Sequence, residues 1–128
     1  MISFFPNQEE GYFVSKFTGE ITDDELLNSY KEYFEDEEWI PLSVELVDLS
    51  EIDRTTVTSD GINRFARYIE NQLIERGINT YYTAVYAPHD LTYGLSRIYD
   101  VMTNESPESV MVFRQLSDAV SWIKEIQK

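Results

Sequence analysis

The apolar positions of this chain follow two spacings in turn, and the alternation predicts strands and helices. Short runs rich in β-branched and aromatic residues, bounded by Pro, Gly, Asn or Asp, are typical of strands. Five such runs occur, at residues 2–5, 12–17, 44–49, 81–87 and 110–113. Elsewhere apolar residues recur every three or four positions, which indicates helices that bury one face. The predicted order is β-β-α-β-α-β-α-β-α.

The first predicted helix begins at a capping box. The Thr22 hydroxyl can accept a hydrogen bond from the Glu25 amide, while the Glu25 side chain reaches back to the helix start. The apolar stripe that follows consists of Leu26, Leu27, Tyr30, Tyr33 and Phe34. The exposed face then consists of Asp24, Asn28 and Glu32.

Three more helices are predicted from the same periodicity. The second ends at Gly77, which can adopt the left-handed conformation, and it buries Ile62, Phe65, Ala66, Ile69 and Leu73. The third opens at residues 88–90, and its predicted apolar face consists of Leu91, Leu95, Ile98, Tyr99 and Met102. The last is capped by Ser117 with Asp118, and its apolar face consists of Ala119, Val120, Ile123 and Ile126.

Strands that alternate with helices in this way predict parallel pairing through right-handed crossovers. Leu46 beside Val47 breaks strict alternation in the third strand, which indicates a central strand covered on both faces. Pro6, Asn7 and Gly11 separate the first two strands and favour a hairpin. We therefore predict an α/β fold with a central, mostly parallel five-stranded sheet, an antiparallel first strand and four flanking helices.

Length and charge narrow the class of protein. The 128 residues suit a single domain over positions 1–128, and 42% hydrophobic residues supply a core. Twenty-four Asp and Glu against ten Lys and Arg give a net charge of −14, which repels phosphate backbones and anionic membrane surfaces. We therefore expect no nucleic-acid partner, and the simplest role of the charge is a well-hydrated surface.

Several kinds of site are missing from the sequence. There is no Cys, which excludes disulfides, thiolate nucleophiles and thiolate metal sites. No glycine-rich phosphate loop, GxSxG motif or recognisable pair of catalytic carboxylates occurs, so we predict no enzyme activity and no cofactor. The first ten residues do not resemble a signal peptide, and no apolar run approaches about 18 residues. We expect a cytoplasmic protein without a transmembrane segment.

The polar segment before the second helix holds the first group of candidate binding residues. Loops at this kind of strand-to-helix junction often carry the sites of α/β domains. The candidates are Asp53, Thr55, Thr58, Ser59 and Asp60. Asp48 and Asp53, with Thr55, could converge on a cation, and the alternative is hydrogen bonding to loop amides.

A second group of candidates lies at the third helix and consists of His89, Tyr93, Gly94 and Arg97. His89 beside Asp90 could serve as an acid, a base or a metal ligand, and the alternative is a capping role. Gly94 costs about 1 kcal/mol relative to Ala in a helix, which predicts close packing or the approach of a ligand. Arg97 could pair with an anionic ligand or form a salt bridge with an acid on a neighbouring element. Of the two, we expect the salt bridge.

The element order, the strand end at residues 48–53 (DLSEID) and the helix start at 58–61 (TSDG) together resemble the STAS and SpoIIAA-like superfamily. The resemblance is closer to its small bacterial members described as STAS/SEC14 domain-containing proteins, and it covers nearly the whole chain. Residues 93–99 resemble a helix of these proteins in which an aromatic residue and Gly precede a small residue and Arg. The resemblance implies the SpoIIAA-like fold and a role in regulation.

Antagonist STAS domains begin the corresponding helix with Asp-Ser-Ser-Gly, and the first Ser is phosphorylated to switch partner binding. Residues 58–61 match this turn, so the resemblance implies Ser59 as the phosphoacceptor. Thr58 replaces the preceding Asp and Asp60 replaces the second Ser. A phosphate on Ser59 would be attracted by the helix dipole and repelled by Asp60. The alternative for Ser59 or Thr58 is a plain helix cap.

Two functions fit these observations. The first is a non-enzymatic regulatory or interaction domain that binds a protein partner, or itself as a homodimer, through strand-end loops and helix faces. The second is a carrier of a small molecule or lipid, with an apolar pocket near Tyr93, Gly94 and residues 50–60. An enzyme that uses His89 with Asp or Ser ranks third.

Overall fold

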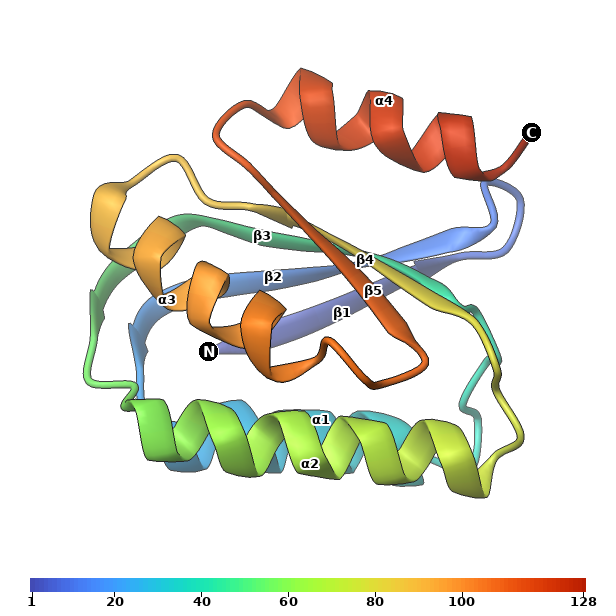
Figure 1. Ribbon diagram of the computed structural model, residues 1–128, viewed down its shortest axis with the longest axis horizontal. Helices are drawn as coiled ribbons and strands as arrows, with labels where there is room; N and C mark the ends of the chain where they lie inside the picture. Colours follow the sequence, from blue (N-terminus) through green and yellow to red (C-terminus); the bar gives the residue numbers. More distant parts are fainter.

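The computed structural model describes residues 1–128 as one twisted sheet with helices on both faces (Figure 1). The strands are β1 (Ile2–Asn7), β2 (Tyr12–Ile21), β3 (Val44–Thr55), β4 (Tyr81–Tyr86) and β5 (Glu108–Phe113). The helices are α1 (Asp23–Glu35), α2 (Ser59–Glu75), α3 (Asp90–Met102) and α4 (Leu116–Ile126). The predicted order of elements is confirmed.

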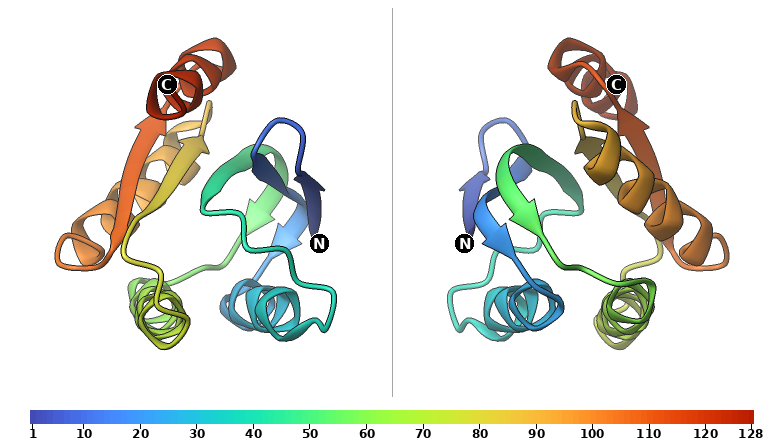
Figure 2. Two further views of the ribbon diagram at one scale, coloured as in Figure 1. Left: turned by 90° about the vertical axis from the view of Figure 1, so that its right-hand side faces the viewer. Right: turned by 90° about the vertical axis from the view of Figure 1, so that its left-hand side faces the viewer.

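The strands lie in the order β1-β2-β3-β4-β5. β1 pairs with β2 in the antiparallel sense and the other three pairings are parallel, as predicted. Right-handed crossovers that advance in one direction across a sheet leave their helices on one face. α1, α2 and α3 accordingly lie on one face, and α4, which follows the last strand, covers the other (Figures 1 and 2). No helix combines the length and the apolar character that crossing a membrane requires.

The sheet separates two hydrophobic cores. The larger lies against α1, α2 and α3, and its most buried side chains include Phe13, Ile21, Tyr30, Phe34, Leu73 and Tyr81. The smaller lies under α4 and consists of Val44, Leu46, Ala84, Ala119 and Ile123. Trp39 packs against the larger core and Trp122 against the smaller. The central position of β3, covered on both faces, is confirmed.

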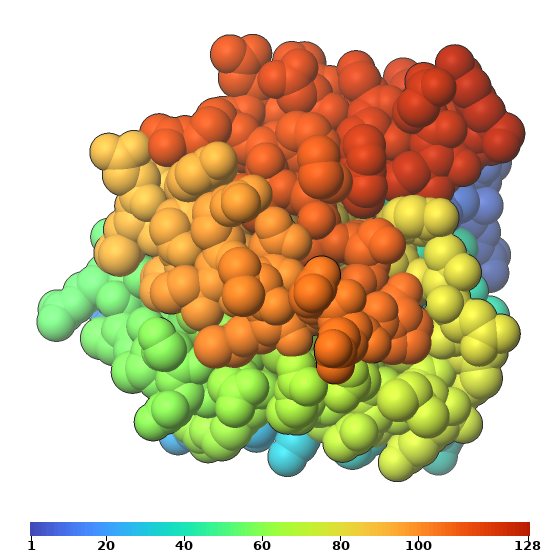
Figure 3. Space-filling model, in the orientation of Figure 1, coloured from blue at the N-terminus to red at the C-terminus, as the bar shows by residue number.

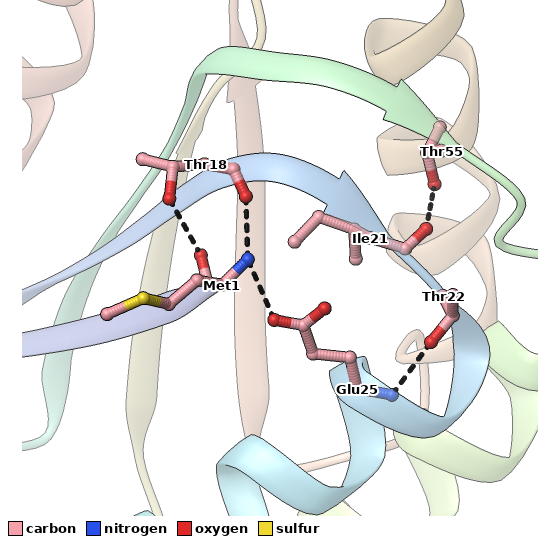
Figure 4. A network of polar contacts seen from close by, with 6 residues as sticks. All are labelled: Met1, Thr18, Ile21, Thr22, Glu25 and Thr55. Carbon is pink, nitrogen blue, oxygen red and sulfur yellow. Dashed lines mark hydrogen bonds and ion pairs between the residues drawn. The ribbon is translucent and has the colours of Figure 1, made fainter.

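A network of polar contacts holds the start of α1 (Figure 4). The Thr22 hydroxyl accepts from the Glu25 amide at 3.1 Å, as the capping box predicts. The Glu25 carboxylate instead contacts the Met1 amino nitrogen at 2.7 Å, and that nitrogen also donates to the Thr18 carbonyl at 2.6 Å. The Met1 amino group thus links the beginning of the chain both to β2 and to α1.

The polar segment after Leu49 continues the strand, which corrects the prediction of a loop. β3 extends to Thr55, and its last part pairs with β2 across an irregular register that ends at Ile21 with Thr55. β3 pairs with β4 only as far as Asp48. Because β2 is ten residues long, it continues to pair with β3 beyond that point. Ile52, half-buried between exposed Glu51 and Asp53, keeps the alternation of a strand.

Two helix starts also differ from prediction. α4 begins at Leu116, one residue before the predicted cap Ser117, and its N-cap Gln115 makes no side-chain capping bond. Asp118 instead lies in the first turn, where a negative charge is favoured by the helix dipole. α3 begins at Asp90, so His89 is its N-cap residue, but the imidazole makes no capping bond.

The buried face of α3 is rotated relative to the predicted apolar stripe. Its buried residues are Thr92 and Ser96, while Leu91 is 63% exposed. A β-carbon at Gly94 would meet open space, so the predicted close packing there is wrong. α3 therefore turns small polar groups toward the sheet, which becomes important below.

Candidate functional site

The carboxyl ends of β3, β4 and β5 meet at one edge of the sheet, at the left of Figure 1. The His89 Nε2 lies 3.4 Å from the Ser50 carbonyl oxygen, which joins the end of β4 to β3. The Arg114 guanidinium, after β5, donates to Asp90 Oδ1 at 2.7 Å and lies 4.9 Å from the centre of the Tyr93 ring. We call residues 87–91 and 114–116, together with Ser50, the strand-end surface.

The start of α2 forms a second polar cluster. The Asp23 carboxylate accepts from the Thr58 amide at 2.8 Å and from the Thr58 hydroxyl at 2.6 Å. The same hydroxyl accepts from the Gly61 amide at 3.0 Å, so Thr58 caps the helix and Ser59 does not. A β-carbon at Gly61 would overlap the Asp23 carboxylate. The absence of a side chain at Gly61 therefore leaves the space that the Asp23 carboxylate occupies between the starts of α1 and α2.

Replacing Gly61 by alanine should destabilise the protein through Asp23. The displaced carboxylate loses its two hydrogen bonds to Thr58, which we expect to cost about 1–3 kcal/mol. In an Asp23→Ala background the same change should be neutral or stabilising, because alanine is the better helix former by about 1 kcal/mol. Urea unfolding of the four proteins in this cycle measures the change in unfolding free energy caused by Gly61→Ala in each background. Equal effects of Gly61→Ala in both backgrounds would refute the contact.

The remaining candidates of the polar segment are not gathered into one site. Asp53, Ser59 and Asp60 are exposed. The Thr55 hydroxyl donates to the Ile21 carbonyl at 3.0 Å, and Asp48 accepts from the amide and hydroxyl of Ser50. The Thr55 hydroxyl also accepts from the Val57 amide at 3.1 Å, so Asp48 and Thr55 each bind a nearby amide, which was the alternative to a cation site. No group of three or more His, Asp or Glu side chains is placed to hold a metal ion.

Arg97 forms a salt bridge, but within its own helix. Its guanidinium lies 3.3 Å from the Asp100 carboxylate, one turn along α3. The partner is therefore not on a neighbouring element, which corrects the expectation from the sequence. An exposed pair of this kind contributes a few tenths of a kcal/mol.

A cavity of about 100 Å³ lies between the sheet and helices α1, α2 and α3. Fourteen of its twenty lining residues are hydrophobic, among them Phe17, Leu49, Val57, Phe65 and Leu95. It borders residues 50–60 through Ile52, Thr55 and Val57. On α3 the lining residues are Thr92, Leu95, Ser96 and Tyr99, and not the expected Tyr93 and Gly94.

The floor of this cavity holds a buried glutamate on β3. Glu45 is 3% exposed and accepts hydrogen bonds from the hydroxyls of Ser15, Tyr30 and Tyr81, the last at 2.9 Å. Burial raises the pKa of Glu45, and these three donors partly counter the rise. Burial raises the pKa of Tyr30 and Tyr81 well above its usual range, so both remain donors.

A second buried glutamate, Glu108, begins β5. Its carboxyl group accepts from the Thr83 and Tyr99 hydroxyls, each at 2.5 Å, and the residue as a whole is 6% exposed. Burial raises the pKa of Glu108 to about 7; the two hydrogen bonds lower it and the charge of Glu45 adds to the rise. Near neutral pH the protonated form of this carboxyl group is therefore populated.

The sequence prediction did not identify either glutamate. Glu45 stands inside the apolar run of the third predicted strand, and Glu108 lies two residues before the last one. One signal was available for Glu45, because alternation along a strand places it on the same face as Val47 and Leu49. An acidic residue on a buried face indicates a hydrogen-bonded core site.

Comparison with known proteins gives a fold. No protein-family profile matches the chain, and no curated protein sequence matches it. An uncharacterized DUF3478-family protein from Shewanella loihica PV-4, described as having a SpoIIAA-like fold, is 19% identical, with a TM-score of 0.53. That match covers 96% of this chain and 92% of the other.

A second solved structure is the anti-sigma factor antagonist SpoIIAA in its unphosphorylated form. It is 8% identical, with a TM-score of 0.58, over 97% of this chain and 98% of that one. Together with the observed order of elements, these matches confirm the predicted SpoIIAA-like fold. At such identities they show the fold alone.

Proposed function

We propose that this chain, with its SpoIIAA-like fold, is a non-enzymatic regulatory domain that acts as one unit over residues 1–128. It binds a protein partner, or a second copy of itself, through the strand-end surface and the start of α2. The likeness to a solved anti-sigma factor antagonist supports a role in regulation. The choice of the strand-end surface as the binding site is supported by the residues that it exposes.

The observation that carries the proposal is a pair of exposed leucines on the strand-end surface. Leu91 is 63% exposed and Leu116 is 45% exposed, although both lie in the first turn of amphipathic helices. Close to both leucines in the chain lie the partners of the Arg114–Asp90 ion pair, and the Arg114 guanidinium lies over the Tyr93 ring. Apolar side chains beside an ordered arginine resemble the composition of protein interfaces. Holding the arginine in place before binding also reduces the entropy lost on association.

Ser59 remains a candidate phosphoacceptor within this proposal. It is exposed at the first turn of α2, and Thr58 takes the capping role, which leaves the Ser59 hydroxyl accessible. A phosphate would gain from the helix dipole, but Asp60 and the nearby Asp23 carboxylate would oppose it. Phosphopeptide mass spectrometry of protein isolated from its host decides whether the group is present.

Replacing Leu91 by aspartate should abolish binding of the partner. The new charge would be buried in the interface without a counter-ion, so we expect at least about a tenfold loss of affinity. The matched control is Ile74→Asp, because Ile74 is 62% exposed on α2 but lies outside the strand-end surface. Affinity capture from host extract identifies partners, and titration of the purified partner with the three proteins measures the effect.

Self-association is tested separately by size-exclusion chromatography with light scattering. A dimer that dissociates on Leu91→Asp but persists with Ile74→Asp would support binding between copies through this surface. A monomer at all concentrations, together with partner binding that is indifferent to Leu91→Asp, would refute the proposal.

A further inference from the structure

The polar part of the cavity wall is acidic and lacks any cation. Its twenty lining residues include Glu45 and Glu108 but no Lys, Arg or His. The ion pairs of the molecule all lie elsewhere, on more exposed side chains. Buried carboxyl groups in proteins are normally paired with a cation or a metal, or they take up a proton, since hydroxyl donors compensate the cost of burying the charge only in part. Here the protein itself supplies no cation to the ionised form.

The two glutamates differ in the hydrogen-bonding capacity that they have left. A carboxylate offers about four acceptor positions. Glu45 uses three of them, for Ser15, Tyr30 and Tyr81. Glu108 uses two, for Thr83 and Tyr99. Glu108 is therefore the better placed to accept hydrogen bonds from a further donor inside the cavity.

The remainder of the cavity is apolar and reaches toward the surface. The lining residues that are only half-buried are Ile52 and Thr55 at the end of β3, Val57 in the segment after it, and Leu95 and Tyr99 on α3. α3 lies on the surface between α2 and α4 in the space-filling view (Figure 3). We place the entrance between α3 and the end of β3, with Glu108 at the far, buried end.

We propose that this cavity binds a small hydrophobic amine, whose ammonium group donates hydrogen bonds to Glu108 while its apolar body packs among Phe17, Phe65 and Leu95. The volume limits the size of the ligand, because the cavity, at about 100 Å³, is smaller than the engineered cavity of about 150 Å³ that holds benzene. A short branched chain therefore fits inside it, and a single ring reaches toward the entrance. The acidic wall excludes carboxylates such as fatty acids, and a purely apolar molecule would leave the spare acceptors of Glu108 unused. The site is independent of the strand-end surface and of any protein partner.

Four probes of one shape test the chemistry. Benzylamine, benzyl alcohol, toluene and benzoate share a ring and differ in the group attached to it. Calorimetric titration at about pH 8, where Glu108 is ionised in most molecules, should give benzylamine at least about a tenfold higher affinity than benzyl alcohol. Toluene should bind more weakly still, and benzoate should not bind.

Two variants locate the binding. Glu108→Gln keeps the shape of the side chain and should reduce the affinity for benzylamine to that for benzyl alcohol, with the alcohol unchanged. Glu32→Gln, on the exposed face of α1, is the control for loss of one charge. Ser96→Leu fills the cavity and should abolish binding of every probe. The Ser96 hydroxyl donates only to the Thr92 carbonyl within α3, so its loss strands no partner elsewhere.

The outcomes are distinct. Benzoate binding as tightly as benzylamine, equal affinity for all four probes, or no binding of any of them by the wild-type protein would overturn the proposal. So would a preference for benzylamine that survives Glu108→Gln. The probe series on the wild-type protein tests the proposal even where a variant does not fold. Leu91→Asp should leave benzylamine binding unchanged, so failure of the interaction function and failure of this site can be told apart.

Discussion

Glu45→Ala is expected to lower the free energy of unfolding by at least about 3 kcal/mol. The change leaves three buried hydroxyl donors, from Ser15, Tyr30 and Tyr81, without their acceptor. Each buried donor that loses its partner costs about 1–3 kcal/mol, although the donors can recover part of this by bonding to one another or to water. Denaturant unfolding at about pH 7 measures the difference.

The matched comparison is Glu45→Gln, which retains a carbonyl acceptor in the same position. It should cost clearly less than Glu45→Ala, because only part of the network is disrupted. An exposed glutamate on the same strand, Glu51, serves as the control for truncation of the side chain. If Glu45→Ala falls within about 0.5 kcal/mol of Glu51→Ala, the network does not contribute to stability.

The protein should lose about 3 kcal/mol of stability between about pH 4.5 and pH 7 through Glu108. Its pKa of about 7 in the folded state lies above the ordinary 4.5. Over this interval the folded chain holds a proton that the unfolded chain has released, so stability falls as the pH rises and then levels off above pH 7. Each unit of pKa difference corresponds to about 1.4 kcal/mol.

Subtracting the unfolding free energy of the Glu108→Gln variant from that of the wild type separates the effect of Glu108 from the titration of surface carboxylates. Glu108→Gln cannot titrate, so the difference between its unfolding free energy and that of the wild type should carry the predicted slope. The ionisable groups around Glu108 are Glu45 on β3, Tyr81 on β4, Tyr30 on α1 and Tyr99 on α3, and the tyrosines stay neutral over this range. A difference that is flat from pH 4.5 to pH 7 would contradict the raised pKa.

The architecture was predictable because it follows from local spacing. The strand at residues 44–49 has apolar residues on both faces, which sufficed to place it at the centre of the sheet. α1 and α2 follow their predicted caps and stripes, since Thr22 and Thr58 lie directly before amphipathic segments. The errors occurred where tertiary contacts outweigh local pattern. β3 continues through polar residues to Thr55 because β2 is long enough to pair with it.

The cavity and its glutamates could not be predicted in the same way. Glu45 and Glu108 approach each other only because Glu45 pairs with Thr83, while Tyr81, two residues earlier on β4, pairs with Glu108. That register is a property of the assembled sheet. The face of α3 misled the prediction for a related reason. Leu91 and Ile98 mark a plausible apolar stripe, but Thr92 and Ser96 are the residues turned toward the cavity.

One of the only two tryptophans in the chain packs against each of the two hydrophobic cores. Trp39 lies beside Arg76 and Phe34 on the α1–α2 side, and Trp122 packs against Tyr82 and Phe113 beneath α4. Variants that keep one indole therefore carry a separate fluorescent reporter for each layer of the molecule. Fluorescence from Trp122 that changes before that of Trp39 during unfolding would show α4 leaving an otherwise intact sheet.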